Sequence, residues 1–336
     1  MILVTGGTGL LGSHLLYELV REHEEVVALK RPSSDLRAVK RTFACRSEEW
    51  EDYFRLIDWV DADLLSPSSL DALMLDVDQV YHCAAMVSFH PGEARKMIHY
   101  NDVSTENIVN LCMEAGVEKL LHVSSSSTIG KAPAGQEATE DHIWARTRTS
   151  SAYSLSKFRS EMRVWRGIEE GLKAVIVNPG IIMGGGHGNR GSSSVFVRVD
   201  RGLSMAAPGV TGFVGVEDVV TVMTRLMDSE ITGERFIVSS ENLSYKEVFE
   251  MIAAALGKPR IMGEVKPAAL LTLARLDGIR GALTGKRALT PYQARSAFQI
   301  RTFSNRKVCE TLDFEFTPVK QVIARVASCY QKEFSL

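Results

Sequence analysis

The stretch "ILVTGGTGLLGSHLL" at residues 2–16 passes from an apolar run, through four glycines, into a pattern typical of a helix. Glycines at a strand-to-helix turn allow the backbone to approach a pyrophosphate that is held at the helix N-terminus. The glycines fit two registers, one led by Gly7 and one led by Gly6, and both registers include Gly9 and Gly12. A glycine-rich turn can also be merely structural, so the rest of the chain has to decide between these interpretations.

Beyond this turn, short β-branched runs alternate with longer amphipathic stretches. The strand candidates are "ILVTG", "EVVALKR", "VDQVYHCAA", "EKLLHVSS" and "KAVIVNPG". Such alternation predicts right-handed βαβ units and hence an α/β fold with a doubly wound parallel sheet of the Rossmann type. Two later runs, "GFVGVEDVV" and "ERFIVSS", are expected to return to the sheet or its edge, and the pattern after them is mostly helical.

The chain has 336 residues and 45% apolar content, which is enough for one large core and an appended subdomain. We expect a dinucleotide-binding Rossmann domain at residues 1–178 plus about 210–240. A smaller, mostly helical substrate-binding subdomain is expected at about 179–209 plus 241–336. The stretch "GGGHGNRGSSS" at residues 184–194 is typical of a long flexible loop that leaves the sheet.

The net charge and the cysteine spacing argue against several kinds of partner and site. The formal net charge is −2, from 39 basic and 41 acidic residues, so no general field exists to hold a nucleic acid. The five cysteines are widely spaced without a C-x-x-C pair, which argues against a disulfide framework and a zinc site, and the scattered histidines predict no other metal site. No leader sequence precedes the first strand, and no apolar run reaches the roughly 18 residues of a membrane span. We therefore expect a protein of the reducing cytoplasm without a membrane or nucleic-acid partner.

Two cations follow the second predicted strand. An acidic side chain at this place would accept a hydrogen bond from the adenosine ribose of NAD, but this chain has Lys30 and Arg31 there. Two cations favour a 2′-phosphate, so we predict NADP as the cofactor, with NAD as the alternative. The competing interpretation is that both are only exposed charges at a strand end.

The stretch "SSAYSLSKFRSE" contains Tyr153 and Lys157 at a spacing of four residues. On a helix such residues share one face, so the phenol and the ammonium can point into the same cleft. A nearby ammonium favours the phenolate and is expected to lower the tyrosine pKa toward the working range of an acid or base. Ser125 ends a predicted strand about 28 residues upstream.

Together these motifs resemble the extended short-chain dehydrogenase/reductase superfamily, the NAD(P)-dependent epimerase/dehydratase family, and within it the dihydroflavonol 4-reductase-like proteins. The resemblance runs over most of the chain in the family's order, from "VTGGTGLLGSHL" through "NDVSTENIVNLC", "YSLSK" and "VNPGIIMGGG" to "FSNRKVCETLDFEFTPVKQVI". It selects the register of Gly6, Gly9 and Gly12, with Gly7 as a neighbour in the same turn.

The resemblance implies a role for each motif residue. Tyr153 would be the catalytic acid/base, Lys157 would hold the nicotinamide ribose, and Ser125 would hydrogen-bond the substrate oxygen, although Ser124 or Ser126 fit by a slip of one. Asn101 matches the asparagine of the helix after the fourth strand. The cofactor-binding residues implied are Gly6, Thr8, Gly9, Leu10, Leu11, Gly12, Lys30, Arg31, Asp63, Leu64, Cys83, Ala84, Ala85, Tyr153, Lys157, Pro179, Gly180 and Ile182. The substrate contacts implied are Met86, Phe89, Ser126, Asn178 and His187.

Three enzyme classes share this set of residues. Dehydratases of the family carry an Asp-Glu pair after the catalytic serine, but here Ser126 and Ser127 follow it, which disfavours dehydration. The apolar "MVSF" stretch favours reduction of a small, partly apolar carbonyl compound, or oxidation of the matching alcohol, with NADP. The alternatives are a nucleotide-sugar epimerase with retained NAD and a non-catalytic dinucleotide-binding regulator, and the latter is disfavoured because the serine, tyrosine and lysine are present. By resemblance we also expect a homodimer.

Overall fold

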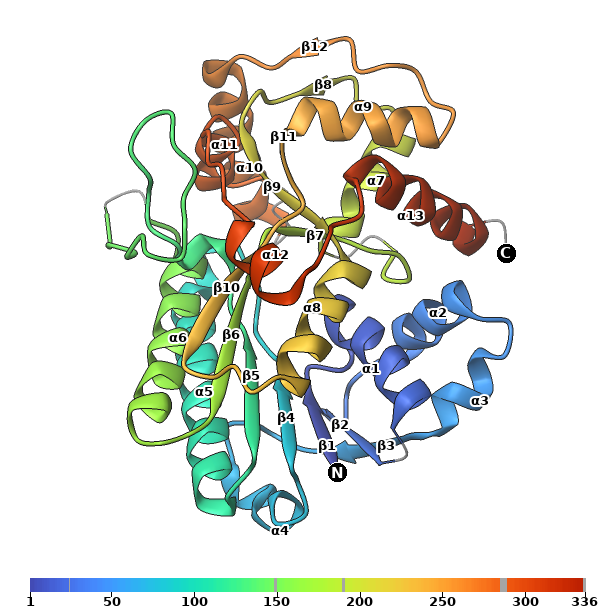
Figure 1. Cartoon of the computed structure of the whole chain (residues 1–336). Helices are drawn as coiled ribbons and strands as arrows, with labels where there is room; N and C mark the ends of the chain where they lie inside the picture. The colour runs from blue at the N-terminus through green and yellow to red at the C-terminus, as the bar shows by residue number, and fades with distance from the viewer. Residues whose placement is uncertain (24, 148–149, 189–190, 285–288, 335–336) are drawn as a thin grey trace.

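A seven-stranded parallel sheet forms the centre of the molecule (Figure 1). The computed structural model describes residues 1–23, 25–147, 150–188, 191–284 and 289–334. The strand order is β10-β6-β5-β4-β1-β2-β3. The strands are β1 (Ile2–Thr5), β2 (Val26–Lys30), β3 (Ile57–Asp61), β4 (Gln79–His82), β5 (Lys119–Val123), β6 (Ala174–Pro179) and β10 (Glu234–Val238). The predicted doubly wound Rossmann sheet is thus confirmed.

The direction of the strand order changes between β1 and β4. The chain builds β1, β2 and β3 outward on one side and then returns to build β4, β5 and β6 on the other. Thr5 ends β1 opposite His82 at the end of β4, so the two carboxyl ends lie side by side. A crevice at such a switch point is where open α/β sheets bind their ligands.

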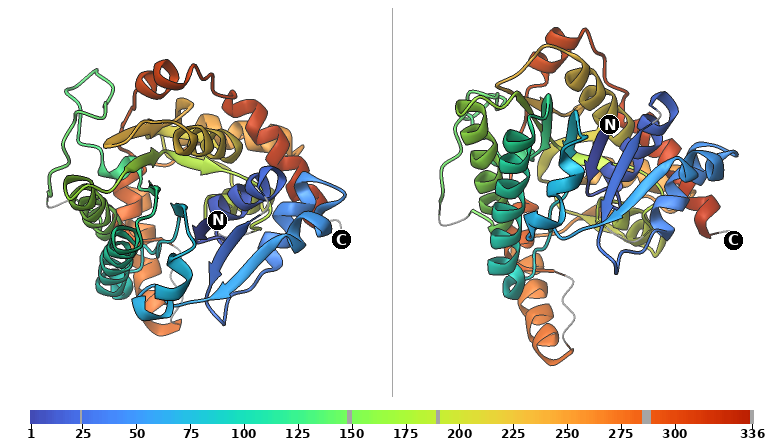
Figure 2. Two further views of the ribbon diagram at one scale, coloured as in Figure 1. Left: turned by 60° about the horizontal axis from the view of Figure 1, so that its bottom comes forward. Right: turned by 90° about the horizontal axis from the view of Figure 1, so that it is seen from below.

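Helices cover both faces of the sheet, as the views from two sides show (Figure 2). One face is packed by α1 and α8, with α2, α3 and α12 beyond them, and the other by α4, α5 and α6. The bounds are α1 (Leu10–Glu22), α2 (Arg37–Arg46), α3 (Trp50–Arg55), α4 (Asp71–Met74), α5 (Ala94–Ala115), α6 (Ala152–Glu169), α8 (Val216–Asp228) and α12 (Arg306–Leu312). Four short 3-10 turns are η1 (Pro67–Ser69), η2 (Pro91–Glu93), η3 (Ser126–Thr128) and η4 (Gly191–Ser193).

Helices α5 and α6 are the pair expected at a dimer interface. Arg163 of α6 donates to Asp102 and to Glu106 of α5, at 2.8 and 2.7 Å. Phe158 stacks on Trp144 of the same chain, with 4.6 Å between ring centroids, whereas Met162 is 39% exposed. The pair is thus held together within one chain, and the dimer stays a prediction.

The C-terminal region is mainly helical and has its own apolar core. Two small sheets accompany the seven-stranded sheet, one of three strands in the order β11-β9-β7 and one of β12 and β8. The strands are β7 (Ile181–Met183), β8 (Met205–Ala206), β9 (Val210–Gly215), β11 (Glu241–Ser244) and β12 (Gly263–Glu264), and the helices are α7 (Ser194–Asp200), α9 (Tyr245–Ala255), α10 (Pro267–Thr284), α11 (Pro291–Ser296) and α13 (Val319–Phe334).

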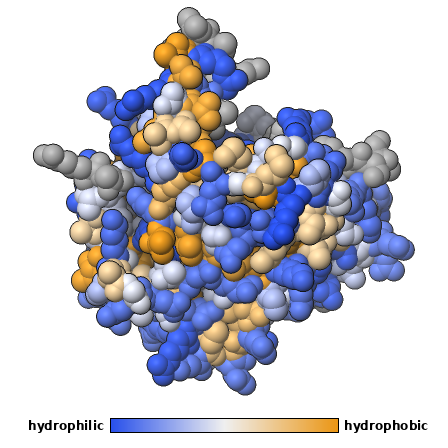
Figure 3. All heavy atoms as spheres, turned by 90° about the horizontal axis from the view of Figure 1, so that it is seen from above, coloured by the Kyte–Doolittle hydropathy of each residue, from blue (hydrophilic) through white to orange (hydrophobic). Residues whose placement is uncertain are grey.

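Helix α10 projects from the body of the molecule. Its side chains Leu273, Leu276 and Ile279 are 54%, 56% and 62% exposed, and apolar surface runs along the projecting part (Figure 3). Within the residues that the structure describes, neither this helix nor another is long and apolar enough to cross a membrane.

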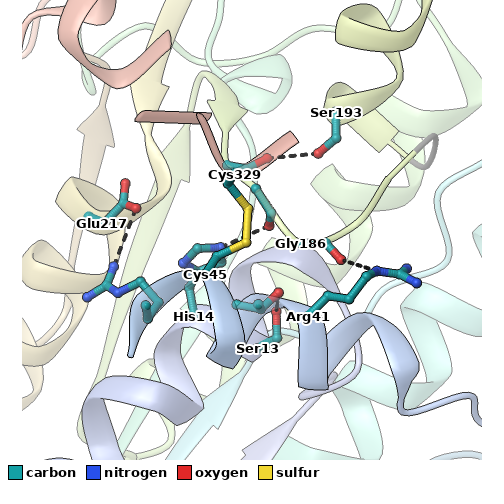
Figure 4. The surroundings of a disulfide bond; sticks show 12 residues. Ser13, His14, Arg41, Cys45, Gly186, Ser193, Glu217 and Cys329 are labelled. Carbon is teal, nitrogen blue, oxygen red and sulfur yellow. Dashed lines mark hydrogen bonds and ion pairs between the residues drawn. A yellow bond between two sulfur atoms is a disulfide. The ribbon is translucent and has the colours of Figure 1, made fainter. Parts of the chain in front are cut away.

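A disulfide joins the N-terminal and C-terminal parts of the chain. It corrects the prediction that the cysteine spacing argues against disulfides. Cys45 of α2 is bonded to Cys329 of α13, 284 residues away in sequence (Figure 4). The prediction was wrong because spacing detects only local frameworks, whereas this pair is brought together by the packing of the two helices. Cys83, Cys112 and Cys309 are free thiols.

Around the disulfide, the glycine-rich loop after β7 packs against α1 and α2 (Figure 4). The Gly186 carbonyl accepts a hydrogen bond from Arg41 Nε at 3.2 Å, and the Gly185 carbonyl lies 3.2 Å from His14 Nε2. Gly186 has φ +89°, and a Cβ there would lie 2.2 Å from Thr42 Oγ1. Residues 184–188 are therefore a packed seam between the Rossmann sheet's helices and α13, not the open loop that their composition suggests.

Candidate active site

The glycine turn lies at the switch point, between the end of β1 and the start of α1. Gly6 has φ +73°, and a Cβ on it would lie 2.6 Å from the Ala84 backbone nitrogen. A Cβ on Gly12 would lie 2.3 Å from the Gly6 carbonyl oxygen, and Gly9 N donates to the same oxygen at 2.9 Å. Gly6, Gly9 and Gly12 thus form one tight turn in front of a helix N-terminus, a cradle that fits a pyrophosphate.

The backbone after β4 crosses directly over this turn. Cys83 N donates to the Thr5 carbonyl and Ala84 N to Thr5 Oγ1, both at 3.2 Å. Thr5 Oγ1 in turn lies 2.7 Å from His82 Nδ1. The predicted cofactor segment from Cys83 to Ala85 is therefore fixed beside the glycine turn.

The strand-end cations differ in their surroundings. Lys30 forms an ion pair with Asp61 at the end of the neighbouring strand β3. Arg31 is exposed just beyond β2, where its backbone N–H donates to Ser34 Oγ at 3.1 Å. Asp63 is also exposed, and its carboxylate accepts from the Leu65 backbone at 3.0 Å. Of the two cations, Lys30 is therefore engaged in an ion pair, whereas the Arg31 side chain is exposed.

Ser125, Tyr153 and Lys157 come together at the ends of β5 and α6. Ser125 is the N-cap of η3, and its side chain lies close enough to Tyr153 to lower the pKa of that phenol. Lys157 lies one turn further along α6, is 4% exposed, and donates from Nζ to the Val123 carbonyl at 2.8 Å. The predicted side chains therefore share one cleft.

The electrostatics of the cleft correct one expectation. Burial raises the pKa of Tyr153, and the neighbouring Ser125 side chain offsets that shift only in part. Burial also lowers the pKa of Lys157 to about 8, against the opposing effect of Cys83 and Glu161. The pKa of Tyr153 was expected to fall beside an ammonium, but desolvation of the phenolate raises it instead.

Asn101 holds the loop that follows β4. Its Oδ1 accepts from Met86 N at 2.7 Å, and its Nδ2 donates to the Met86 carbonyl and to Ser156 Oγ, both at 3.0 Å. The side chain is therefore engaged with backbone and with α6. In this geometry Asn101 positions the predicted substrate loop.

The predicted substrate residues divide into two groups. The ring of Phe89, 42% exposed, lies 5.8 Å from the ring of Tyr153, and Ser126 directly follows Ser125. In contrast, the Asn178 side chain is buried and donates to Thr128 Oγ1 at 2.9 Å. His187 is 5% exposed and lies 3.0 Å from Ser13 Oγ in the seam, away from the Ser125–Tyr153 pair.

The turn after β6 packs closely against neighbouring backbone. A Cβ on Gly180 would lie 2.6 Å from the Gly212 carbonyl oxygen, and Gly180 N donates to the Val238 carbonyl at 3.0 Å. Pro179 ends the buried strand β6, and Ile182 lies in β7. The residues of this predicted nicotinamide contact are therefore held in place by the two strands and by close backbone packing.

A model of the NAD dependent epimerase/dehydratase family matches residues 2–239. The chain belongs to this family. Proteins of the epimerase/dehydratase family are NAD(P)-dependent reductases, epimerases and dehydratases, so this protein is an oxidoreductase-type enzyme with an NAD(P) nucleotide as its cofactor. The cradle of Gly6 and Gly12, in which no Cβ has room, fits that cofactor.

Three further comparisons show which known proteins this chain resembles. Sterol demethylase protein B of Methylococcus capsulatus is 28% identical over 278 residues, which are 82% of this chain and 80% of that protein. A Synechocystis sp. protein named for dihydroflavonol 4-reductase is 25% identical over 335 residues, 98% of this chain and 94% of the relative. The crystal structure of gox2253 shares the fold, with a TM-score of 0.81 at 23% identity over 99% of this chain and 98% of that chain. The predicted family and fold class are therefore confirmed.

Sequence reasoning missed Glu161, a fully buried carboxylate on α6. It lies four residues after Lys157 and eight after Tyr153, so all three share one helix face. That spacing was the available signal, but a glutamate on a helix is usually solvated. Among the described residues, no group of three or more His, Cys, Asp or Glu side chains is placed to hold a metal ion.

Two neutral imidazoles lie beneath the cleft and should make stability depend on pH. His82 and His122 are fully buried and stacked, with 5.3 Å between ring centroids. Burial lowers the pKa of His82 to about 3 and that of His122 well below its usual value. The unfolded chain therefore binds more protons below pH 6.5, and each imidazole should cost about 2 kcal/mol of unfolding free energy between pH 7 and pH 5.

The variant His122→Phe tests this expectation. Neither ring nitrogen of His122 has a hydrogen-bond partner within the described chain, so its loss should leave no new unpaired group. Urea unfolding at pH 7 and pH 5 should show a pH dependence smaller by about 2 kcal/mol than in the wild type. The exposed His99→Gln serves as control, and an unchanged dependence in His122→Phe would contradict the assignment.

Proposed function

We propose that this protein is an NADP-dependent reductase that converts the carbonyl of a small, partly apolar substrate to an alcohol, or runs the reverse oxidation. The observation that supports it most is that Ser125 lies next to Tyr153, one helical turn from buried Lys157. A bound nicotinamide supplies or accepts the hydride at the substrate carbon. The residues of the chain handle the oxygen and its proton.

The raised pKa of Tyr153 suits carbonyl reduction. A phenol that stays protonated at neutral pH can donate its proton as negative charge grows on the substrate oxygen. Ser125 hydrogen-bonds the same oxygen, and Lys157, fixed on the Val123 carbonyl, supplies a positive charge that stabilises the phenolate left behind. This division of roles needs no further acid or base.

The surroundings of Tyr153 favour an apolar substrate. The Phe89 ring lies over the cleft, and Val87 beside it is 60% exposed. The Methylococcus relative is named for sterol demethylation and the Synechocystis relative for a flavonoid reductase. These features together support a polycyclic or aromatic ketone or alcohol as the substrate class.

A nucleotide-sugar epimerase with retained NAD is the second candidate. The observation in its favour is the Lys30–Asp61 ion pair, which takes up one of the two cations offered to a 2′-phosphate. An epimerase keeps its nicotinamide through the reaction, whereas a reductase exchanges it.

A panel of carbonyl compounds tests the proposal. The purified enzyme is assayed with NADPH and NADH on ketosteroids, flavonoid-like ketones, aromatic aldehydes and nucleotide sugars. We expect NADPH oxidation with the ketosteroids or flavonoid-like ketones. Turnover confined to nucleotide sugars, with tightly bound NAD in the purified protein, would establish the epimerase instead.

Arg31 should decide between the two cofactors. The variant Arg31→Ala is expected to raise KM for NADPH about tenfold and leave KM for NADH unchanged, because only NADPH presents a phosphate to the guanidinium. Lys30→Ala should have a smaller effect, since Asp61 already neutralises that ammonium. Arg55→Ala on α3, where the side chain is exposed, is the matched control. Equal effects on both cofactors would contradict a 2′-phosphate contact.

A further inference from the structure

Glu161 gathers donors from three different elements onto one carboxylate. Its Oε2 accepts from Ser124 Oγ at 2.6 Å, Thr128 Oγ1 at 2.7 Å and Asn178 Nδ2 at 3.0 Å. Its Oε1 accepts from Arg235 Nη1 of β10 at 2.9 Å. Glu161, Thr128 and Asn178 are all 0% exposed, so water does not compete for these bonds.

The donors on Oε2 flank the two turns that shape the cleft. Ser124 and Thr128 stand on either side of Ser125 and its 3-10 turn, at the end of β5. Asn178 directly precedes the Pro179–Gly180 turn at the end of β6. Because Glu161 is itself on α6, one side chain ties the serine turn and the predicted nicotinamide turn to the helix that carries Tyr153.

Only a carboxylate satisfies this arrangement. A fully buried charge is costly unless it is paired and hydrogen-bonded, and here both oxygens are. A glutamine of the same shape would offer one oxygen and one NH2, and the NH2 would face donors on whichever side it took. The group is therefore specific in chemistry as well as in size.

We propose that Glu161 is a positioning residue of the reduction, whose carboxylate holds Ser125 and the turn after Asn178 in place against Tyr153. This inference rests on the proposed reductase function. Glu161 does not touch the reacting atoms, and it acts through the residues that do. Its charge has a second effect, because it favours the ammonium form of Lys157 and so raises the pKa of that lysine against the effect of burial.

The variant Glu161→Gln tests the proposal. We expect kcat to fall about 10- to 100-fold while KM for NADPH stays within about twofold, since the reacting groups are displaced but the phosphate cradle is not. The alkaline limb of the kcat profile should move to lower pH, because Lys157 loses the charge that supports its ammonium. A residue with a merely structural role would not move that limb.

Two further variants distinguish the effect of the donors on Oε1 from that of the donors on Oε2. Arg235→Met removes the charged donor on Oε1, together with the Arg235 hydrogen bonds to the Glu140 and His142 carbonyls, and leaves every donor on Oε2 in place. It should lower stability while kcat stays within about threefold and the alkaline limb stays in place. Thr128→Val removes one donor on Oε2 without a change of charge, so kcat should fall with no movement of the limb. If Glu161→Gln does not fold, Thr128→Val decides the proposal.

The outcomes that overturn the proposal are distinct from failure of the reductase function. A kcat of Glu161→Gln within about threefold of the wild type, or an equal loss in Arg235→Met, would show a role in stability alone. If the wild type reduces no carbonyl in the panel, the proposed function fails, and hydrogen exchange without substrate then decides the positioning. Faster exchange at residues 124–128 and 178–180 in Glu161→Gln, but not in Arg235→Met, would support it, and equal exchange in both variants would overturn it.

Discussion

Replacement of Tyr153 by phenylalanine is expected to lower kcat by about 10²- to 10⁴-fold and to leave the affinity for NADPH unchanged. The variant removes the proton that the substrate oxygen receives in the proposed reduction. It keeps the ring that packs 5.8 Å from Phe89, so the cleft should hold its shape. Steady-state turnover with the best substrate of the panel and a fluorescence titration with NADPH measure the two quantities.

The control is Tyr245→Phe, which removes a hydroxyl from a largely buried tyrosine of the C-terminal core. That variant should keep full turnover. Ser125→Ala should cost less than Tyr153→Phe, because it removes a stabilising hydrogen bond while the proton donor remains. If Tyr153→Phe retained more than a tenth of the wild-type turnover, the proton donor would have to be sought elsewhere in the cleft.

The strands that the sequence predicted are those that are buried over most of their length. β1, β5 and β6 are buried at each residue, and each contains an apolar run. β3 was not predicted, because this edge strand has the sequence "IDWVD" and exposes both of its aspartates. An edge strand needs only one apolar face, and in five residues that pattern is too weak to stand out.

The site residues that could be predicted are those whose relative positions follow from local spacing in the sequence. Tyr153 and Lys157 lie on one helix face, and Ser125 lies just beyond the end of β5, so their meeting follows from the fold class. The surroundings of Glu161 and the place of His187 do not follow, since their partners lie 17 to 174 residues away in sequence. The direction of the Tyr153 pKa shift was wrong for the same reason, because burial is a property of the packed cleft.

Loss of the Cys45–Cys329 disulfide is expected to lower the unfolding free energy by about 2 to 4 kcal/mol. The bond joins two residues that are 284 apart in sequence, so it closes a loop that contains most of the chain. Breaking it therefore returns a large conformational entropy to the unfolded state. Urea unfolding of Cys45→Ser measures the loss, and Cys309→Ser, which removes a free thiol, is the matched control. The wild type treated with a dithiol reductant should behave as Cys45→Ser does.

The variant Cys45→Ser should also bind NADPH more weakly. Without the bond, α13 no longer holds the Gly185–Gly186 seam against α1, whose N-terminus forms the phosphate cradle, so affinity for NADPH should fall together with stability (Figure 4). Equal NADPH affinity in Cys45→Ser and the wild type would show that the seam and the cradle are independent.

The redox state of the disulfide tests the predicted location in the cell. The cytoplasm keeps thiols reduced, so the thiols of Cys45 and Cys329 can be counted by mass spectrometry on protein that is trapped in intact cells. A fully oxidised pair would argue against it, and a reduced pair would mean that the enzyme works in its less stable form.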